Sequence, residues 1–261
     1  MILAPLTLRS GAGARAAAPE TGGPRSEANP SVRDAASLIL LRADPEPRVL
    51  MGLRGAAAAF MPNKFVFPGG AVDADDAAAP SARRLDAACA ARLAKESPAD
   101  RPAAAFAHAA LRETFEETGL RLAARPDPEP AAADADGLGD SWRSFCADGL
   151  GPNAGALRFV FRAITPPGPP RRFDARFFLA SAAAVIGDPD DFSAASGELS
   201  HLTWAPLADA RALDLPFITA VVLAEIQSLL DGGWRPDQGP PPDRPVPFFR
   251  HAGGGSEFVA L

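Results

Sequence analysis

The chain has 261 residues, of which 47% are hydrophobic and 22% are charged, so it is long enough to bury one sizeable core. Its formal net charge of -6 gives no basic field of the kind that binding to a nucleic-acid backbone requires. A small anionic substrate stays possible, because a metal ion can supply local positive charge. The two cysteines, Cys89 and Cys146, have no CxxC spacing, so neither a zinc site nor a disulfide framework is indicated, and a reducing cytoplasm is expected. No apolar run is long enough to span a membrane.

The amino-terminal part of the chain begins with a segment of low complexity. Residues 1–30 are rich in Pro, Gly, Ala and Arg and predict a disordered tail. Two apolar runs at 35–42 and 48–54, separated by Asp44-Pro-Glu-Pro47, predict a β-hairpin. A third run at 65–72 contains the pair Gly69-Gly70, which permits another group to approach the backbone closely.

The strongest helix prediction follows an Ala/Asp/Arg-rich segment at about 76–100, which we interpret as a surface insertion with a helix near 82–95. Residues 103–118 have high helix propensity. Asp100 is a suitable N-cap, Pro102 suits the first turn and Gly119 supplies a carboxy-terminal stop.

The second half of the chain is also predicted to contain both helices and strands. Helices are expected at 138–150, 206–212 and 217–230, and strands at 157–164, 172–179 and 199–204. The mixture predicts an α/β protein with a mixed sheet between helices. One domain at 31–235 is expected, followed by a Pro/Gly-rich tail at 236–261.

Three glutamates of the strongest helix share one face. Residues of an α-helix advance about 100° each, which places Glu113, Glu116 and Glu117 within an arc of roughly 100°. Arg112 precedes Glu116 by four residues and is positioned to form an ion pair with it. Carboxylates this close repel one another unless a cation compensates them, and hard oxygen ligands suit Mg2+ or Mn2+. Single glutamates on a helix are otherwise ordinary solvated residues.

The run Arg112-Glu-Thr-Phe-Glu-Glu-Thr-Gly-Leu120 resembles the signature of the Nudix hydrolases, G-x5-E-x7-R-E-U-x-E-E-x-G-U, where U is aliphatic. Thr114 departs from it at an aliphatic position. The upstream glycine, Gly70, lies about 28 residues further from Arg112 than the signature allows, and the 76–100 segment accounts for this distance. Asp76 stands six residues after Gly70, where the signature has its first Glu.

The split signature and the preceding Phe67-Pro-Gly-Gly70 resemble the acyl-coenzyme A diphosphatase-like subgroup of that family. Leu50-Met-Gly-Leu-Arg54 matches the start of the coenzyme A motif of related enzymes, L-L-T-K-R-(S/A)-x3-R-x3-G-x3-F-P-G-G. Ala59 and Asn63 replace the second Arg and the Gly of that motif. Coenzyme A, acyl-coenzyme A, ADP-ribose, dinucleotides and nucleotide sugars therefore all stay open as substrates.

The resemblance implies a Nudix-type α/β/α sandwich and a metal-dependent pyrophosphohydrolase acting on a small X-diphosphate-Y molecule. Glu113, Glu116 and Glu117 would bind Mg2+ or Mn2+. The catalytic candidates are Glu117, Glu113 and the loop residue Glu198, and the substrate-binding candidates are Arg54, Gly69 and Gly70.

Other residues are weaker candidates for the site, and other functions are less well supported. His108 lacks a His or Cys partner and is expected to be a packed histidine, and Phe60, Phe65, Phe173 and Trp204 are core residues more readily than base-stacking platforms. Arg171, Arg172 and Arg176 either assist an anionic substrate or form a solvated face. A non-catalytic binding module is the alternative function. Diphosphate isomerase chemistry is disfavoured because neither cysteine lies on a predicted core strand.

Overall fold

The computed structural model describes residues 30–56, 58, 60–97, 100–126, 137–238, 244–252 and 254–261. The predicted amino-terminal tail, apart from Pro30, lies outside the described residues. The strands are β1 (Val32–Arg42), β2 (Arg48–Arg54), β3 (Phe65–Val66), β4 (Gly69–Ala71), β5 (Ala123–Ala124), β6 (Gly151–Pro152), β7 (Arg158–Ile164), β8 (Arg172–Ser181), β9 (Leu199–Pro206), β10 (Pro247–Ala252) and β11 (Gly255–Ala260). The α-helices are α1 (Ala87–Ala94), α2 (Ala103–Thr118), α3 (Asp140–Phe145), α4 (Leu207–Ala210) and α5 (Phe217–Asp231), and short 3-10 helices include η1 (Ala74–Ala77) and η3 (Ala147–Gly149).

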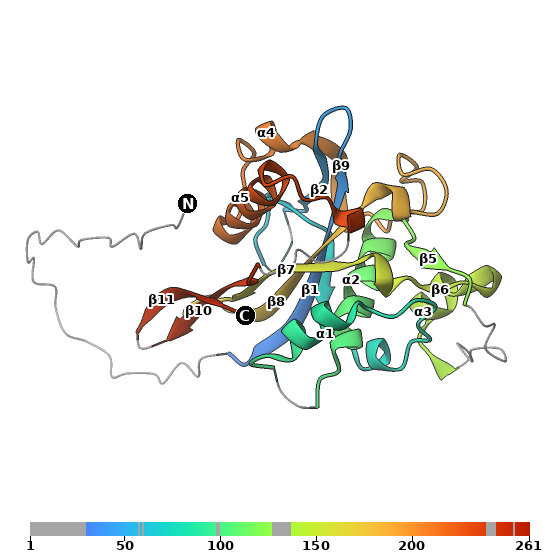
Figure 1. Cartoon of the computed structure of the whole chain (residues 1–261), viewed down its shortest axis with the longest axis horizontal. Helices are drawn as coiled ribbons and strands as arrows, with labels where there is room; N and C mark the ends of the chain where they lie inside the picture. The colour runs from blue at the N-terminus through green and yellow to red at the C-terminus, as the bar shows by residue number, and fades with distance from the viewer. Residues whose placement is uncertain are drawn as a thin grey trace, which may run out of the picture.

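A nine-stranded sheet forms the centre of the molecule (Figure 1). Its main path runs β11-β10-β7-β8-β1-β2-β3, with β4 added to β1 and β9 added to β2. The β1–β8 and β10–β7 pairs are parallel and the other pairs are antiparallel. The sheet is therefore mixed, as the sequence predicted.

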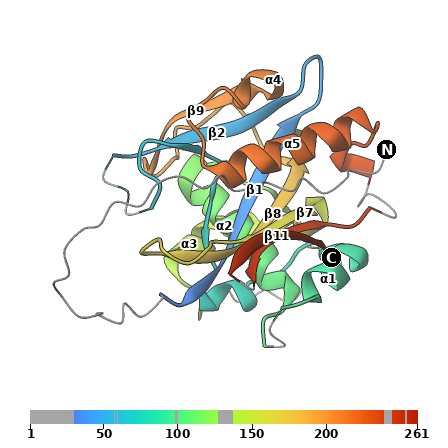
Figure 2. The same cartoon turned by 90° about the vertical axis from the view of Figure 1, so that its left-hand side faces the viewer.

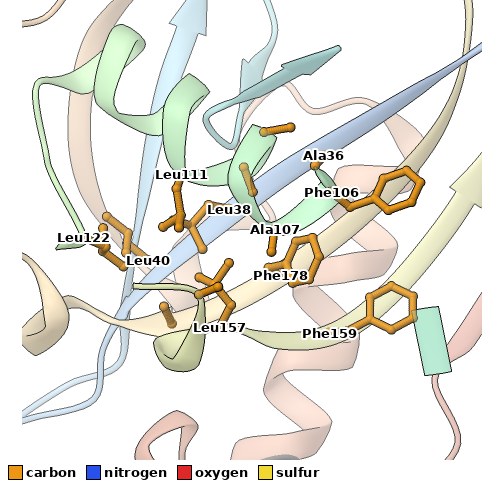
Figure 3. Close-up of a cluster of buried hydrophobic side chains, with 14 of the residues drawn as sticks. Ala36, Leu38, Leu40, Phe106, Ala107, Leu111, Leu122, Leu157, Phe159 and Phe178 are labelled. Atoms are coloured by element: carbon orange, nitrogen blue, oxygen red, sulfur yellow. The ribbon is translucent and has the colours of Figure 1, made fainter. Parts of the chain in front are cut away.

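Helices cover both faces of this sheet, which confirms the predicted sandwich (Figures 1 and 2). On one face, side chains of α2 pack against β1 and β8, and Figure 3 shows Phe106, Ala107 and Leu111 beside Leu38 and Phe178. On the other face, α5 packs against a second buried cluster. Residues 38–41 of β1 are all fully buried, because a central strand covered on both faces has no solvent side.

Helix α2 has the bounds that the sequence predicted, but its start differs. Pro102 is the N-cap and no side chain caps the helix, because Asp100 lies two residues too early to reach the first turn. Gly119 ends the helix in the left-handed region at φ 78°, as a carboxy-terminal glycine is expected to do. The carboxylates therefore lie on a regular helix that stops two residues after Glu117.

The 76–100 segment is more deeply packed than the predicted surface insertion. Helix α1 begins at Ala87, later than predicted, because the Asp86 side chain caps it by accepting hydrogen bonds from the amides of Ala88 and Cys89. Cys89 and Leu93 are buried in the core on the α2 face. This segment therefore contributes to the core as well as to the surface.

The carboxy-terminal segment also differs from the prediction of a Pro/Gly-rich tail. Strands β10 and β11 form an antiparallel hairpin, and β10 pairs with β7 through Phe248 and Phe249. The buried Phe248 ring lies under the guanidinium group of Arg162. Aromatic side chains between the prolines and glycines thus extend the sheet beyond residue 235.

The remaining predicted strands are present with small shifts in their ends. The helix expected at 138–150 is instead α3 followed by η3, because Asp148 adopts a positive φ of 65°. No helix among the described residues is long and apolar enough to cross a membrane.

Candidate active site

The face of α2 predicted to carry three carboxylates lies beside strand β4. Glu117 is buried, Glu113 is largely buried and Glu116 is half-exposed. One atom of the adjacent arginine joins two of them: Arg112 Nη1 lies 2.8 Å from Glu113 Oε1 and 3.3 Å from Glu116 Oε2. The ion pair predicted between Arg112 and Glu116 is confirmed.

The Gly69-Gly70 pair lets two of these carboxylates approach the sheet. The Gly69 amide donates a 2.8 Å hydrogen bond to Glu117 Oε2, so this amide positions a carboxylate in the structure. A methyl group on Gly70 would collide with the Glu113 carboxylate. Gly69 has φ 156° and no room for a side chain beside Ser37. Close approach of the backbone therefore leaves Gly69 no room for a side chain, whereas a side chain at Gly70 would displace the Glu113 carboxylate.

Burial changes the acidity of the two inner carboxylates. Burial raises the pKa of Glu113 to about 7, although the charge of Arg112 opposes this shift. Burial raises the pKa of Glu117 to about 8, with the Gly69 amide opposing the shift and the charges of Glu113 and Glu198 adding to it. Raised carboxyl pKa values in a cluster show that the negative charge lacks full compensation from the protein.

Arg112 links α2 to the 76–100 segment. Its Nε and Nη2 atoms donate to the two oxygens of Asp76 over 2.8 and 3.0 Å, and Nη2 also donates to the Ala71 carbonyl. The Asp76 carboxylate is completely buried. The bidentate pair fixes the guanidinium plane, so the third nitrogen points toward Glu113 and Glu116.

A loop after residue 187 reaches the same helix. The Ser196 amide donates to the Glu116 carbonyl over 2.9 Å. Glu198, at the end of this loop, pairs with Arg54 at 3.2 Å, and Arg54 lies at the end of β2. Charges of both residues act on Glu117. The structure thus brings the predicted loop acid and the predicted substrate-binding arginine to the glutamate face.

Comparisons with known proteins identify the family of this chain. No family model matches the chain. A Caenorhabditis elegans protein described as a nudix hydrolase is 32% identical over 186 residues, 67% of this chain but 51% of that protein, so the chain spans about half of that relative's length. The crystal structure of a Nudix hydrolase from Alicyclobacillus acidocaldarius shares 32% identity and a TM-score of 0.54, covering 74% of this chain and 90% of that one.

The chain belongs to the Nudix hydrolase family. In the terms of the Nudix signature, Asp76 occupies the place of the first Glu and contacts the signature Arg112 directly. The residues between these two positions leave the contact intact. Thr114, at a position that is aliphatic in the signature, is buried and donates its hydroxyl to the Ala110 carbonyl at 2.7 Å. Neither departure disrupts the Nudix helix.

Several residues weighed from the sequence have other partners. Arg176 is fully buried and pairs with Asp34 and Asp174, which is neither a solvated face nor a substrate contact. Arg172 donates to the Thr165 carbonyl. The charge of Arg176 is therefore compensated inside the sheet, and Arg172 contacts a main-chain carbonyl.

The aromatic and cysteine residues considered from the sequence also contact other protein groups or lie buried. The Phe60 and Phe173 rings pack edge to face 5.2 Å apart, and Trp204 lies under the guanidinium group of Arg42 at 4.0 Å. His108 is buried, as expected of a packed histidine. Cys89 is buried in α1, and Cys146 follows α3.

One residue at the site was missed by sequence reasoning. The indole nitrogen of Trp142, in α3, donates to Asp76 Oδ1 over 3.1 Å. The two residues are 66 positions apart, and no local pattern connects them. Trp142 and Phe145 form the buried face of α3.

Proposed function

We propose that this chain hydrolyses a diphosphate linkage in a small X-diphosphate-Y molecule with the help of Mg2+ or Mn2+ bound by Glu113, Glu116 and Glu117. The observation that carries the proposal is the grouping of three carboxylates of α2 over the glycine pair of β4, with two of them buried and incompletely compensated. Three convergent hard oxygen donors suit these ions.

The donor set fits a divalent cation, although its side chains are engaged with protein groups. Among the residues that the structure describes, no three acidic, histidine or cysteine side chains stand ready as a cation cage. Arg112 bridges Glu113 and Glu116, and Glu117 is turned to the Gly69 amide. Within the same residues, Glu113 Oε2 and Glu117 Oε1 accept no hydrogen bond, which leaves one oxygen on each for a cation.

The residues around the glutamates have distinct proposed roles. A bound divalent cation would neutralise phosphate oxygens and make water a better nucleophile. Glu198, Glu117 or Glu113 would accept the proton of the attacking water. Arg54 would bind an anionic oxygen of the substrate in exchange for its ion pair with Glu198.

For the substrate we propose coenzyme A or an acyl-coenzyme A, on the strength of the Leu50–Arg54 and Phe67–Gly70 matches to the coenzyme A motif. Arg54 and Gly69 come from the two matched stretches, and both act on Glu117. ADP-ribose, dinucleotides and nucleotide sugars contain the same linkage and form the comparison set.

The test is a hydrolysis panel of acyl-coenzyme A, coenzyme A, ADP-ribose and NADH with Mg2+ or Mn2+. Glu116→Gln is the inactivating variant, and Glu46→Gln is its matched control, because Glu46 is an exposed carboxylate in the β1–β2 turn paired to Arg48. We expect metal-dependent release of 3',5'-ADP from the coenzyme A compounds by the wild type and the control, and none by Glu116→Gln.

Other outcomes of the panel have separate meanings. Cleavage of ADP-ribose or NADH alone would retain the hydrolase and reject the coenzyme A substrate. Absence of turnover of every compound by folded, metal-loaded protein would contradict the hydrolase proposal for these substrates and favour a binding module on the Nudix fold.

A further inference from the structure

The support behind Arg112 extends beyond the Nudix signature into helix α3. The completely buried Asp76 carboxylate accepts four hydrogen bonds. Arg112 donates two of them, the Asp73 amide donates the third over 2.8 Å and the Trp142 indole donates the fourth over 3.1 Å. A carboxylate has about four acceptor positions, so this set of donors fills it and fixes its orientation.

His108 holds the same aspartate through the main chain. Its Nδ1 lies 2.8 Å from the Asp76 carbonyl, and since a carbonyl only accepts, Nδ1 carries the proton. The His108 ring packs edge to face on Trp142 at 5.8 Å. Burial lowers the pKa of His108, so the ring is a neutral donor here. Trp142 and His108 therefore enclose both the side chain and the backbone of Asp76.

We propose that Trp142 is a positioning residue for the metal-binding glutamates, acting through Asp76 and Arg112. The inference rests on the proposed function, since it concerns the cation that Glu113 and Glu116 would hold. The path is continuous: indole nitrogen to Asp76 Oδ1, Asp76 to Arg112 Nε and Nη2, and Arg112 Nη1 to Glu113 and Glu116.

Burial makes the Trp142 hydrogen bond significant for the site. Trp142, Asp76 and Arg112 are each at most 5% exposed, so bulk water has little access to replace a donor that is removed. Without the indole N–H, Oδ1 keeps Arg112 Nε as its one partner, so Asp76 loses one of the four hydrogen bonds that fix its orientation. A shift of Asp76 would move Arg112 Nη1, the direct partner of both glutamates, and loss of such an outer-shell partner weakens metal sites about 10-fold or more.

The test compares Trp142→Phe with Phe145→Leu. The first variant removes the N–H and keeps an aromatic ring. The second loosens packing in the same helix, because the fully buried Phe145 ring lies 5.2 Å from Trp142 and has no polar group. For each variant, the affinity for Mn2+ without substrate is measured from the signal of free Mn2+ in electron paramagnetic resonance, alongside Tm, kcat and KM.

We expect Trp142→Phe to weaken Mn2+ binding about 10-fold and to lower kcat with KM within about twofold. Phe145→Leu should lower Tm without changing Mn2+ affinity. Equal Mn2+ affinity in Trp142→Phe and the wild type would overturn the inference and leave the proposed function standing. An equal loss in both variants would overturn it too, since packing would then explain the effect.

A measurement on unmutated protein covers the case in which Trp142→Phe does not fold. With 5-fluorotryptophan incorporated, saturating Mg2+ should shift the fluorine resonance of Trp142 and leave those of Trp204 and Trp234 in place. An unmoved Trp142 resonance in protein that binds Mg2+ would contradict the inference. Failure of the wild type to bind Mn2+ or Mg2+ at all would instead contradict the proposed function, and the inference with it.

Discussion

Helix α2 and the short turn η1 both build the same site, but they do so in different ways. Helix α2 supplies Glu113, Glu116 and Glu117 by the regular spacing of one element. The turn supplies Asp76, whose partners Arg112 and Trp142 lie 36 and 66 residues away in the chain. The carboxylates of the site thus follow from local sequence spacing in α2, whereas their orientation depends on tertiary contacts. We therefore expect substitutions in η1 to lower the free energy of unfolding and substitutions on the glutamate face of α2 to lower activity.

The largest effect is expected from Asp76→Ala. Removal of this carboxylate leaves Arg112 buried with fewer compensating charges, and breaking a buried ion pair from one side typically costs about 3–5 kcal/mol. Denaturant unfolding should show that loss, together with lost activity. Glu116→Gln is the matched comparison and should lose activity with unfolding free energy changed by less than about 1 kcal/mol. Equal stability in Asp76→Ala and wild type would remove the distinction between the two regions.

The second prediction concerns pH. Glu113 and Glu117 must lose protons before they bind a cation, and their pKa values are raised to about 7 and 8. Mn2+ affinity should therefore rise between pH 6 and pH 9, by about tenfold per pH unit for each proton released below its pKa. Calorimetric titration across this range measures the effect, and Glu117→Gln should flatten its upper part. A pH-independent affinity would contradict the raised pKa values.

The same pKa shifts predict how the stability of the metal-free protein changes with pH. A carboxyl group whose pKa rises on folding from 4.5 to about 8 destabilises the folded state progressively as pH increases through that window. Glu117→Gln should therefore be more stable than the wild type at pH 9. The difference should disappear below about pH 4.5, where both side chains are neutral. Thermal unfolding of Glu117→Gln and of the wild type in the presence of a chelator, at pH 9 and below about pH 4.5, tests this difference.

A smaller effect is expected at Arg54, which belongs to neither α2 nor η1. Loss of a charge-assisted hydrogen bond to an anionic substrate costs about 1.5 kcal/mol at the low end, so Arg54→Ala should raise KM roughly 10-fold. Arg54→Lys, which keeps the charge, should recover part of this loss. Steady-state kinetics at saturating metal make the comparison. An unchanged KM in Arg54→Ala would remove Arg54 from the substrate site.

The smallest effect is expected from Thr114→Val, which restores the aliphatic position of the signature. The Thr114 hydroxyl bonds to a carbonyl inside α2, so its removal should change the unfolding free energy by no more than about 1 kcal/mol. Activity should equal that of the wild type. A large loss of activity would mean that this position of α2 does more than fill the core.

The sequence predicted those parts of the structure that follow from local periodicity. The bounds of α2, its glycine stop and its carboxylate face are all present, because helix propensity and spacing act within one element. The β10–β11 hairpin was missed because its prolines and glycines favour loops, and its pairing with β7 bridges more than 80 residues. Trp142 was missed for a similar reason, since its bond to Asp76 exists only after α3 folds against α2.

The most direct test of the account is hydrolysis of the best substrate from the panel in water enriched in oxygen-18, with Mn2+, by wild type, Glu46→Gln and Glu116→Gln. We expect one heavy oxygen in one phosphate product of the wild type and of Glu46→Gln, and no product from Glu116→Gln or from wild type with chelator. Product formed at the wild-type rate by Glu116→Gln, or without a divalent cation, would contradict it.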